Sequence, residues 1–461
     1  MLFASVSSEE DLQGLVEPVD GVELRLDLFP RIDRPFLEEL KAKSRYPLMF
    51  TLRKASHGGL FRGEEGEREA LIRRLLAAQP PFFDLECDMR AAFLQDIIGK
   101  YGHTTKIILS YHNFIETPAD LESIYAAMAP YKAYSYKIAT MCHSTLDALR
   151  LLLFARTKEK MSVIGMGELG QCTRVLAPVF GSMIGYGSLS ESKKTAPGQL
   201  TLKDLFHIYR YPHLTRTTSI YGLIGDPIGA SEGHIYHNGR FAKEGIDAVY
   251  VKMRLTEEEI PLFFALAKQV PFAGLSVTMP LKEKVFPFIE EIDQEARIMG
   301  AVNTLSFNGE ILIGTNTDGR GALEAIEKKL QVYGKKMVII GAGGAARAIA
   351  FEAKKRGALV LILNRTEARA LLVAKGLGCE GAILSAIPNF YDILVNTTSE
   401  PMPIPADKIV KGSLVMNVAY GGKEAPILLE AKEIGCQTVD GKEMFLNQAA
   451  LQYAFWIGQK K

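Results

Sequence analysis

Short apolar runs alternate with amphipathic stretches along the first two hundred residues of the chain. Eight runs have the length and the β-branched and aromatic content of buried strands. They lie at 2–6, 22–26, 47–52, 82–86, 106–111, 134–139, 160–166 and 183–188. Stretches between them, such as 67–79, 120–128 and 145–156, repeat apolar residues at helical spacing. Eight strands with intervening helices predict a (β/α)8 barrel.

The pattern changes at residues 209–219, a polar and aromatic segment with a proline that is typical of a domain junction. Beyond it the alternation of strands and helices resumes. Residues 335–357 run as strand, glycine turn and helix, which is how a doubly wound nucleotide-binding unit opens. The fold class predicted for the whole chain is therefore α/β, with a barrel followed by a second α/β region.

This pattern also predicts the domain boundaries. The barrel is expected at 1–212 and the second region at 219–461. The second region is expected to have two lobes, at 219–320 and 335–440. A C-terminal helix at about 443–457 is expected to pack back on the first of these lobes.

The chain has 461 residues, a formal net charge of +1, and 48% hydrophobic and 23% charged residues. These values are ordinary for large globular cores, and they exclude a bulk basic field for nucleic acid. The first residues include Glu9 and Glu10 and no basic segment, so a secretory signal is not expected. The longest apolar run, 149–155, is interrupted by Arg150 and is too short to cross a bilayer.

Five cysteines lie scattered along the chain without a CxxC pair, so neither a disulfide framework nor a zinc site is predicted. We expect a soluble protein of a reducing cytoplasm that needs no metal. Its expected partners are small molecules rather than nucleic acid or membrane. The sequence does not predict an oligomeric state.

Unusual polar residues fall at or near the ends of the predicted barrel strands, where barrels of this kind carry their chemistry. They occur from the second strand to the eighth: Glu23, Arg25, Arg53, Glu86, His112, Lys137, Arg174, Thr195 and Gln199. One such residue would mean little, but the repeated placement predicts a single polar site.

Lys137 stands in the middle of YSYKIAT (134–140), a strand of a type that rarely carries a free charge. Among apolar neighbours and arginines its pKa is expected to be depressed. A neutral amine can attack a ketone and form a Schiff base. His112 could then move a proton beside the imine carbon, with Glu86 orienting the imidazole. The arginines suit a substrate that carries a carboxylate.

The alternative is that Lys137 extends to the barrel mouth and pairs with Glu86, while His112 is an ordinary loop histidine. The presence of both residues on neighbouring strands, together with three arginines, favours the catalytic interpretation.

Residues 1 to about 205 resemble the type I 3-dehydroquinate dehydratases. The resemblance rests on ELRLD (23–27), TLRKASHGG (51–59), DLE (84–86), SYHNFIETP (110–118), YKIAT (136–140), a GxxxxxxR–FGS run (167–182) and TAPGQL (195–200). It implies that Lys137 is the Schiff-base lysine and His112 the general acid and base. It further implies that the substrate's carboxylate and hydroxyls contact Arg174, Arg53, Arg25, Glu23 and Gln199. Thr195 departs from the family, which usually has serine there, but it keeps a hydroxyl.

In the second half, GAGGAA (341–346) follows a strand and opens a helix, as in dinucleotide-binding units. The candidate cofactor-binding residues of this turn are Gly341, Gly343, Gly344 and Ala345. The next strand ends in Asn364, Arg365 and Thr366, without the acidic residue that binds the ribose of NAD. Arg365 could instead take a 2′-phosphate, which predicts NADPH as the cofactor. The alternative is that Arg365 merely caps a surface turn.

The preceding lobe contributes a lysine and an aspartate that could meet across a cleft as a proton-relay pair. GLSVTMPLKEKV (274–285) places Lys282 just after a strand closed by proline, and GTNTDGRG (314–321) places Asp318 in a tight glycine loop. Asn303 adds an uncharged donor and acceptor for hydroxyls. Alone, each of the two charges is most simply interpreted as solvated.

These strings, with GAGGAARAI, NRT and GKEMFLNQAA (441–450), resemble shikimate dehydrogenase over residues 219 to about 457. The resemblance implies that Lys282 and Asp318 form the catalytic dyad. It also implies substrate contacts from Thr278, Asn303, Tyr420 and Gln448, hydride delivery from NADPH to 3-dehydroshikimate, and proton donation by Lys282.

The serine-rich loop of that family departs from its usual pattern. The family form GxPIxHSxSPxxHN stands here as GDPIGASEGHIYHN (225–238), which keeps Ser231 but has Gly233 and His234 in place of the second serine and the proline. Those serines hold the substrate carboxylate in the family. We therefore expect either weaker binding or replacement of the contact by His234. Ser276 also stands where the family usually has asparagine.

Both halves thus predict consecutive steps, and the hypothesis is a bifunctional dehydroquinate dehydratase/shikimate dehydrogenase. One rival joins an aldolase-like barrel to a quinate dehydrogenase, but the ELRLD and APGQ strings argue against it. The other rival is a metabolite sensor that has lost one or both activities. The presence of Lys137, His112, Lys282 and Asp318 argues against that sensor.

Overall fold

The computed structural model describes residues 1–458, which fold as two compact units. The first is built mainly of residues 1–219 and the second mainly of the residues that follow. Within residues 1–458, no helix combines the length and the apolar character needed to cross a membrane.

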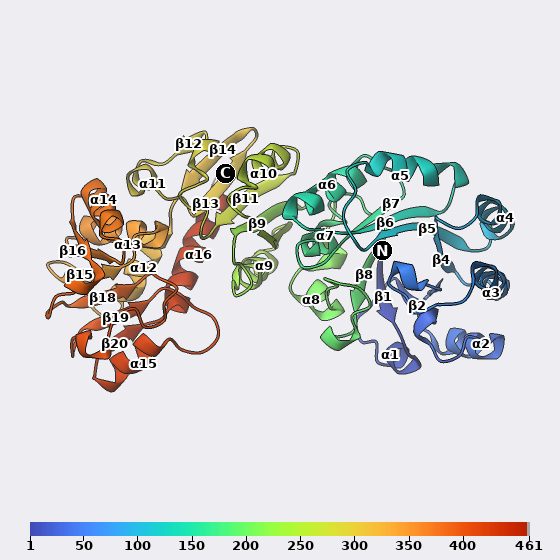
Figure 1. Cartoon of the computed structure of the whole chain (residues 1–461), viewed down its shortest axis with the longest axis horizontal. Helices are drawn as coiled ribbons and strands as arrows, with labels where there is room; N and C mark the ends of the chain where they lie inside the picture. The colour runs from blue at the N-terminus through green and yellow to red at the C-terminus, as the bar shows by residue number, and fades with distance from the viewer. Residues whose placement is uncertain (459–461) are drawn as a thin grey trace. The chain divides into compact units, whose positions relative to one another are not determined.

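The first unit holds an eight-stranded parallel sheet, as the sequence predicted (Figure 1). Its strands are β1 (Leu2–Val6), β2 (Gly21–Arg25), β3 (Leu48–Thr51), β4 (Phe82–Glu86), β5 (Lys106–Asn113), β6 (Ser135–Met141), β7 (Met161–Met166) and β8 (Gly185–Ser188). They pair in the order β7-β6-β5-β4-β3-β2-β1-β8. The predicted strands differ from these bounds by no more than a residue or two.

Helices follow the strands and cover the outside of this sheet. They are α1 (Glu9–Gln13), α2 (Arg34–Lys43), α3 (Glu65–Ala77), α4 (Ala91–Tyr101), α5 (Leu121–Met128), α6 (Thr145–Arg156), α7 (Gln171–Leu176) and α8 (Leu202–His207). Local sequence explains their starts. For example, the Asp33 and Ser144 side chains accept hydrogen bonds from the first turns of α2 and α6.

The barrel is not completely closed, because β7 and β8, the two ends of the sheet, are not joined by a continuous ladder of backbone hydrogen bonds. Individual hydrogen bonds bridge the seam: Met183 N donates to Met161 O at 2.8 Å, and Ile184 N donates to Ser162 Oγ at 3.1 Å. An apolar layer that includes Phe3, Met49 and Phe82 fills the N-terminal half of the strands. The polar site therefore has a packed floor.

The chain beyond residue 219 forms two further sheets. The first is mixed, in the order β10-β9-β11-β13-β14-β12. Its strands are β9 (Ser219–Gly225), β10 (Ala248–Arg254), β11 (Phe272–Val277), β12 (Glu291–Ile292), β13 (Thr304–Asn308) and β14 (Ile311–Thr315). Its helices are α9 (Gly233–Lys243), α10 (Ile260–Ala267) and α11 (Gln294–Met299).

The other sheet is parallel, in the order β17-β16-β15-β18-β19-β20. Its strands are β15 (Lys336–Ile340), β16 (Leu359–Asn364), β17 (Glu380–Ile383), β18 (Ile393–Asn396), β19 (Leu414–Asn417) and β20 (Gln437–Val439). The associated helices are α12 (Asp318–Glu327), α13 (Gly344–Lys355), α14 (Glu367–Leu377), α15 (Pro426–Glu433) and α16 (Gly441–Gly458). This is the 3-2-1-4-5-6 strand order of the Rossmann fold, with its switch point between β15 and β18.

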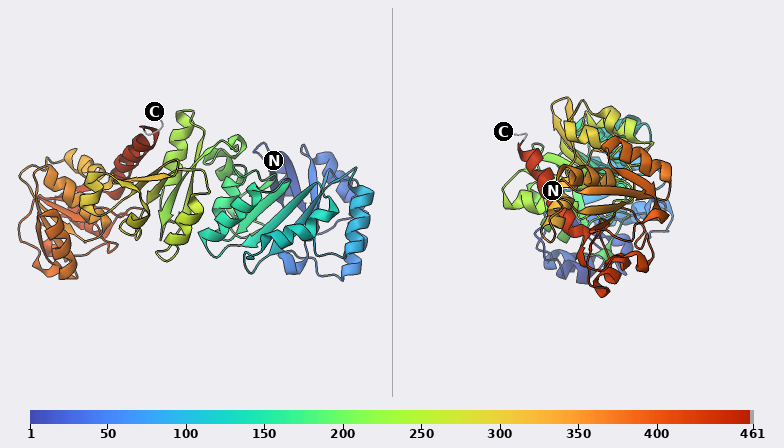
Figure 2. Two further views of the ribbon diagram at one scale, coloured as in Figure 1. Left: turned by 90° about the horizontal axis from the view of Figure 1, so that it is seen from above. Right: turned by 90° about the vertical axis from the view of Figure 1, so that its left-hand side faces the viewer.

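The long C-terminal helix α16 packs back on the mixed sheet, as expected. Trp456 Nε1 donates to Leu305 O at 2.9 Å, and Gln452 Nε2 donates to Asn303 O at 2.9 Å. Figure 2 shows this helix in dark red beside the yellow strands. The helix thus brings side chains from the end of the chain to the loops that follow the mixed sheet.

Candidate active sites

A pocket opens at the C-terminal ends of the barrel strands. Eight of the nine polar residues predicted there line it: Glu23, Arg25, Arg53, His112, Lys137, Arg174, Thr195 and Gln199. Glu86 lies behind this lining. His57, which the sequence analysis did not single out, is part of the pocket wall.

Lys137 is buried at the centre of this pocket, with 3% of its surface exposed. Its ammonium group contacts the Asp84 carboxylate and lies 4.9 Å from the centre of the Tyr186 ring. Burial lowers the pKa of Lys137, and Arg53 lowers it further, although Asp84 opposes the shift. The expected direction of the pKa shift is confirmed. The alternative pairing with Glu86 is wrong, because the partner is Asp84.

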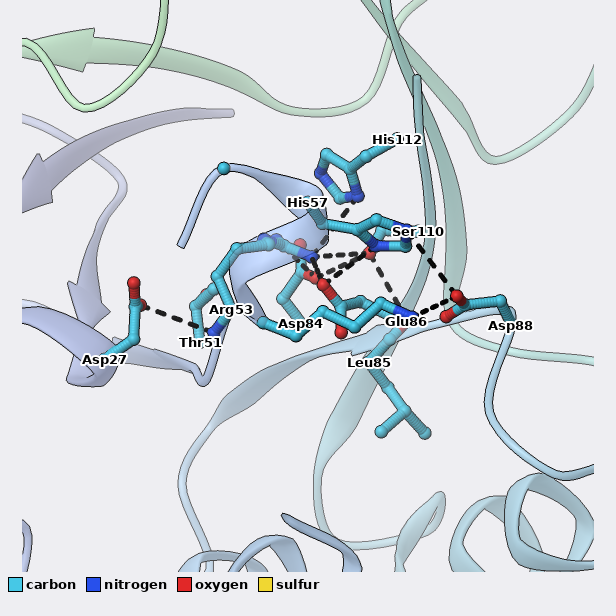
Figure 3. Close-up of polar contacts among 12 residues, drawn as sticks. Asp27, Thr51, Arg53, His57, Asp84, Leu85, Glu86, Asp88, Ser110 and His112 are labelled. Atoms are coloured by element: carbon cyan, nitrogen blue, oxygen red, sulfur yellow. Dashed lines mark hydrogen bonds and ion pairs between the residues drawn. The ribbon is translucent and has the colours of Figure 1, made fainter. Parts of the chain in front are cut away.

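Arg53 connects the lysine to the histidine. Its Nη2 donates to Asp84 Oδ1 at 2.8 Å, and its Nη1 lies 3.3 Å from His112 Nδ1. Because a guanidinium has only donors, His112 Nδ1 must accept, and the neutral imidazole carries its proton on Nε2. Burial holds the pKa of His112 well below its usual value, and Arg53 and Lys137 add to this effect. Figure 3 shows the imidazole above this arginine.

Glu86 has different partners from those expected. Its carboxylate accepts from Arg53 Nη1 at 3.1 Å, from His57 Nδ1 at 3.0 Å and from the buried Arg68. In the described part of the chain, residues 1–458, Glu86 and His112 share no hydrogen bond. The expectation that Glu86 orients the imidazole directly is therefore corrected: Arg53 contacts His112, and Glu86 holds Arg53 (Figure 3).

The three arginines of the site have unequal partners. Arg25 forms a two-pronged ion pair with Asp27, at 3.0 and 2.8 Å, and Arg53 is engaged by Asp84 and Glu86. Arg174 instead donates from Nη2 to the Pro197 carbonyl at 3.0 Å.

Within residues 1–458, no carboxylate lies within ion-pair distance of Arg174, and its buried Nε has no acceptor. Burial lowers the pKa of Arg174 to about 10, which still leaves the side chain charged at neutral pH. Arg174 is thus the arginine of this site that is best placed to bind an incoming carboxylate.

The remaining polar residues form a hydrogen-bonded rim. Glu23 accepts from Ser5 Oγ at 2.8 Å and from Thr51 Oγ1 at 2.9 Å. Gln199 Oε1 accepts from the backbone and hydroxyl of Thr195, at 2.8 and 3.2 Å. These contacts fix the acceptors and donors that a hydroxylated substrate would meet.

A second polar cluster lies in the second unit. Lys282 Nζ donates to Asp318 Oδ2 at 2.5 Å, so the two residues predicted to meet do so. Asp318 is nearly buried, and Lys282 exposes 17% of its side chain. Asp318 begins helix α12 rather than lying in a glycine loop, which corrects the local expectation.

Asn303 holds this dyad in place. Its Nδ2 donates to Asp318 Oδ1 at 2.8 Å and lies 3.3 Å from Gln448 Oε1. Its Oδ1 accepts from Thr317 N at 2.9 Å. The amide thus joins the loop before α12 to helix α16, and four of the predicted site residues meet here: Lys282, Asn303, Asp318 and Gln448.

The other residues predicted to bind the substrate of the dehydrogenase lie in the same unit. The pKa of Tyr420 is raised by burial, and a hydrogen bond with Ser231 opposes that shift. Thr278 is half-buried after β11, and its backbone N donates to Ile224 O at 2.9 Å. His234 is half-buried in the first turn of α9. Ser276, the other departure, donates to Gln452 Oε1 at 3.0 Å and so supports α16.

The glycine turn lies at the switch point between β15 and β18. Gly341 has a φ of 116°, and a Cβ there would lie 2.2 Å from Thr397 Oγ1, so only glycine fits. Gly343 caps helix α13, which begins at Gly344 and continues through Ala345. Free N–H groups at such a helix start can bind phosphate.

At the end of the neighbouring strand, Arg365 and Thr366 are exposed. Asn364 is half-buried, and its Nδ2 donates to Thr366 O at 3.0 Å. No acidic side chain stands at the end of β16. The residues present therefore fit a dinucleotide that carries a 2′-phosphate.

Three family models match the chain. Type I 3-dehydroquinase matches residues 5–216, the shikimate dehydrogenase substrate-binding domain matches 223–305, and shikimate/quinate 5-dehydrogenase matches 324–417. The first match favours the dehydratase interpretation of the barrel over the aldolase-like one.

Relatives extend the similarity over nearly the whole chain. A chloroplastic bifunctional 3-dehydroquinate dehydratase/shikimate dehydrogenase of Arabidopsis thaliana is 35% identical over 95% of this chain and 78% of its own length. The shikimate biosynthesis protein AroDE of Chlamydia pneumoniae is 33% identical over 99% of this chain and 95% of its own.

Among solved structures, a shikimate dehydrogenase in complex with NADP+ is 34% identical, with a TM-score of 0.50, over 53% of this chain and 92% of its own. These similarities and the two sites described above lead to the same assignment. It belongs to the family of bifunctional 3-dehydroquinate dehydratase/shikimate dehydrogenase enzymes.

Proposed function

We propose that Lys137 forms a Schiff base with the ketone of 3-dehydroquinate in the barrel, and that the dyad of Lys282 and Asp318 serves the reduction of the product. The observation that carries the proposal is the buried amine of Lys137 beside a neutral His112. Burial favours the uncharged amine that nucleophilic attack requires.

In the first reaction, the Lys137 amine adds to the ketone and water leaves to give an imine. His112 takes a proton from the carbon next to the imine and gives a proton to the departing hydroxyl, which leaves as water. Another water then hydrolyses the imine, which releases 3-dehydroshikimate and restores the Lys137 amine, so one water is lost overall. Arg174 binds the carboxylate, since its guanidinium has no acidic partner within residues 1–458. Arg25, Arg53, Glu23, Thr195 and Gln199 position the remaining groups, and Glu86 supports Arg53.

In the second reaction, Lys282 gives a proton to the ketone oxygen of 3-dehydroshikimate and regains a proton from solvent. The Asp318 carboxylate orients the lysine and favours its charged form. NADPH, when bound, supplies the hydride. Asn303 fixes Asp318 at 2.8 Å, and with Thr278, Ser231, Tyr420 and Gln448 it contacts the substrate. Short contacts to a buried carboxylate keep the ammonium group oriented during the transfer.

The proposed cofactor is NADPH rather than NADH. The turn formed by Gly341, Gly343, Gly344 and Ala345 would hold the pyrophosphate, and Arg365 with Asn364 and Thr366 would hold the 2′-phosphate. The exposed guanidinium of Arg365 and the lack of an acid at the end of β16 support this choice. The NADP+ complex of the related dehydrogenase supports it as well.

The proposed boundaries are 1–212 for the dehydratase and 219–461 for the dehydrogenase. Within the latter, 219–320 with the C-terminal helix forms the substrate lobe and 335–440 the cofactor lobe. The ranges of the three family matches support this division. We place the enzyme in the cytoplasm, which suits its five free thiols. Its proposed small-molecule partners are 3-dehydroquinate, 3-dehydroshikimate and shikimate.

The test is NADPH oxidation by the purified protein supplied with 3-dehydroquinate alone. We expect oxidation after a lag, with shikimate as the product. Lys137→Ala should abolish dehydration and leave reduction of added 3-dehydroshikimate intact, and Lys282→Ala should do the reverse, so each variant controls the other. Loss of both activities in either folded variant would contradict the two-site proposal. Oxidation of quinate with NAD in place of this series would favour the quinate dehydrogenase alternative.

A further inference from the structure

His57 is a second histidine in the dehydratase pocket, and none of the steps above uses it. It ends the short 3-10 turn Ala55–His57 that follows β3, and it exposes 16% of its side chain. Its ring lies 5.7 Å from the ring of His112, centre to centre. A histidine in this place is inside the reaction chamber rather than on a solvated loop.

The contacts of His57 assign its tautomer. Its Nδ1 lies 3.0 Å from Glu86 Oε1, and the ionised carboxylate can only accept, so Nδ1 carries the proton. Its Nε2 lies 3.5 Å from Asp88 Oδ2. Burial lowers the pKa of His57 to about 4; Asp88 opposes this shift, while the cations of Lys54, Arg53 and Arg68 add to it. The ring is therefore neutral at working pH.

One carboxylate oxygen joins the two histidines. Glu86 Oε1 accepts from His57 Nδ1 and also from Arg53 Nη1, and that same Nη1 faces His112 Nδ1 at 3.3 Å. The N–H of His57 therefore holds the Glu86 oxygen in place, and this oxygen orients the Arg53 guanidinium. The guanidinium in turn donates to the lone pair on His112 Nδ1 (Figure 3). Such chains transmit position because each buried polar group has few alternatives.

The same three groups could suggest a metal site, because ligand atoms of His57, Glu86 and His112 all lie within 4.8 Å of one another. Both Glu86 oxygens, however, already accept from guanidinium groups of Arg53 and Arg68. A divalent cation would face two fixed positive charges at close range. The arrangement favours a hydrogen-bonded support over a metal site.

We propose that His57 is a positioning residue of the dehydratase: through Glu86 and Arg53 it holds His112 in the tautomer and pose that move the substrate proton. This inference rests on the proposed Schiff-base function of the barrel. Lys137 is held by Asp84, so formation of the imine should not depend on His57. Loss of His57 should slow the proton transfer that follows.

The test compares three substitutions. His57→Asn keeps a donor near the position of Nδ1, His57→Gln moves the donor toward the position of Nε2, and His57→Leu removes it. The full chain is used, and its shikimate dehydrogenase activity serves as an internal measure of concentration. Three quantities are measured: kcat of dehydration, borohydride trapping of substrate on Lys137, and the kinetic isotope effect with substrate deuterated next to the ketone.

We expect the Gln and Leu variants to lose about 10- to 100-fold in kcat, as for a misplaced catalytic group. Their isotope effect should rise while trapping on Lys137 continues. The Asn variant should stay within about threefold of wild type, since the donor to Glu86 persists. Near-normal rates in all three variants, or equal losses in Asn and Gln, would overturn the inference.

Loss of trapping in the Leu variant together with loss of rate would also overturn it, since His57 would then act on folding or on imine formation. The Asn variant keeps the question decidable if the Leu variant does not fold. Absence of trapping in the wild-type protein would instead refute the Schiff-base function itself. The two failures are thereby distinguished.

Discussion

The carboxylate of Asp84 contacts the ammonium group of Lys137 inside the barrel, and both side chains are buried. Burial alone would raise the pKa of Asp84, but Arg53 and Lys137 hold it below its ordinary value. Asp84 in turn raises the pKa of Lys137 against the effect of burial. The aspartate thus orients the amine and limits how easily it loses its proton.

Replacing this aspartate should separate the two effects. In Asp84→Asn the amine loses its anionic neighbour, its pKa falls further, and the acid limb of the dehydratase pH profile should move to lower pH by about one unit. The kcat should fall roughly tenfold or more because the amine is less well oriented. The pH dependence of kcat/KM with 3-dehydroquinate measures the shift of the acid limb, and kcat at saturating substrate measures the loss of rate.

The control for this variant is Asp96→Asn, which removes an exposed partner of Arg73 on the barrel surface. It should leave the pH profile unchanged, since exposed pairs contribute little. A shift of the acid limb to higher pH in Asp84→Asn would contradict the assigned role of Asp84.

The pair of Lys137 and Asp84 also marks where sequence reasoning stopped. The barrel strands could be predicted because their apolar runs have the length and period of buried strands. That period places Asp84 and Glu86 on the same face of β4, and nothing in the letters says how deep each carboxylate lies. The pairing depends on depth, so the alternative interpretation of the sequence named Glu86 as the partner, whereas the structure places Asp84 against the lysine.

A similar limit applies to Asp318. The glycines around it suggested a loop, yet Gly319 and Gly321 lie in helix α12. A Cβ on Gly319 would lie 2.3 Å from Ala348 O, and one on Gly321 would lie 2.7 Å from Gln448 Cβ. These glycines allow close packing of helices rather than a turn. His57 was not predicted as a site residue for another reason. It lies in the short loop KASHGG (54–59), which has no strand or helix periodicity that could place its side chain in the pocket.

Arg365 should decide between the two nicotinamide cofactors. In Arg365→Ala the KM for NADPH should rise about 10- to 100-fold, the loss expected for a charged hydrogen bond to a phosphate, while the KM for NADH should change little. Lys375→Ala, an exposed lysine in the last turn of α14, is the charge-matched control. Equal effects of Arg365→Ala on both cofactors would show that the guanidinium does not recognise the 2′-phosphate.

His234 should contribute to carboxylate binding in the dehydrogenase. It lies three residues after Ser231 at the start of α9, where the family pattern has proline. In His234→Ala the KM for 3-dehydroshikimate should rise about tenfold with little change in kcat. Ile235→Ala, an exposed neighbour on the same turn, is the control. An unchanged KM in His234→Ala would remove His234 from the substrate site.

His237 should make the stability of the second unit depend on pH. Its ring lies 5.0 Å from that of Trp456, and Trp456 also packs at 4.9 Å from Tyr221. Burial lowers the pKa of His237 to about 3, although a hydrogen bond with Gln452 opposes the shift. The unfolded chain has a histidine pKa near 6.5, so between about pH 3 and 6.5 it binds more protons than the folded one. Stability therefore rises with pH in this window and is lost as the pH falls.

The chain has one tryptophan, so fluorescence of Trp456 during urea unfolding reports on this unit alone. In His237→Asn the slope of unfolding free energy against pH should decrease by up to roughly 1.4 kcal/mol per pH unit between pH 4 and 6. His103→Asn, an exposed histidine of the barrel, should leave that slope unchanged. Because truncating a buried ring also removes packing, the variant should be less stable at neutral pH, and only the change in slope identifies the titration. A slope equal to that of wild type would mean that His237 takes up its proton in the folded and unfolded chains alike.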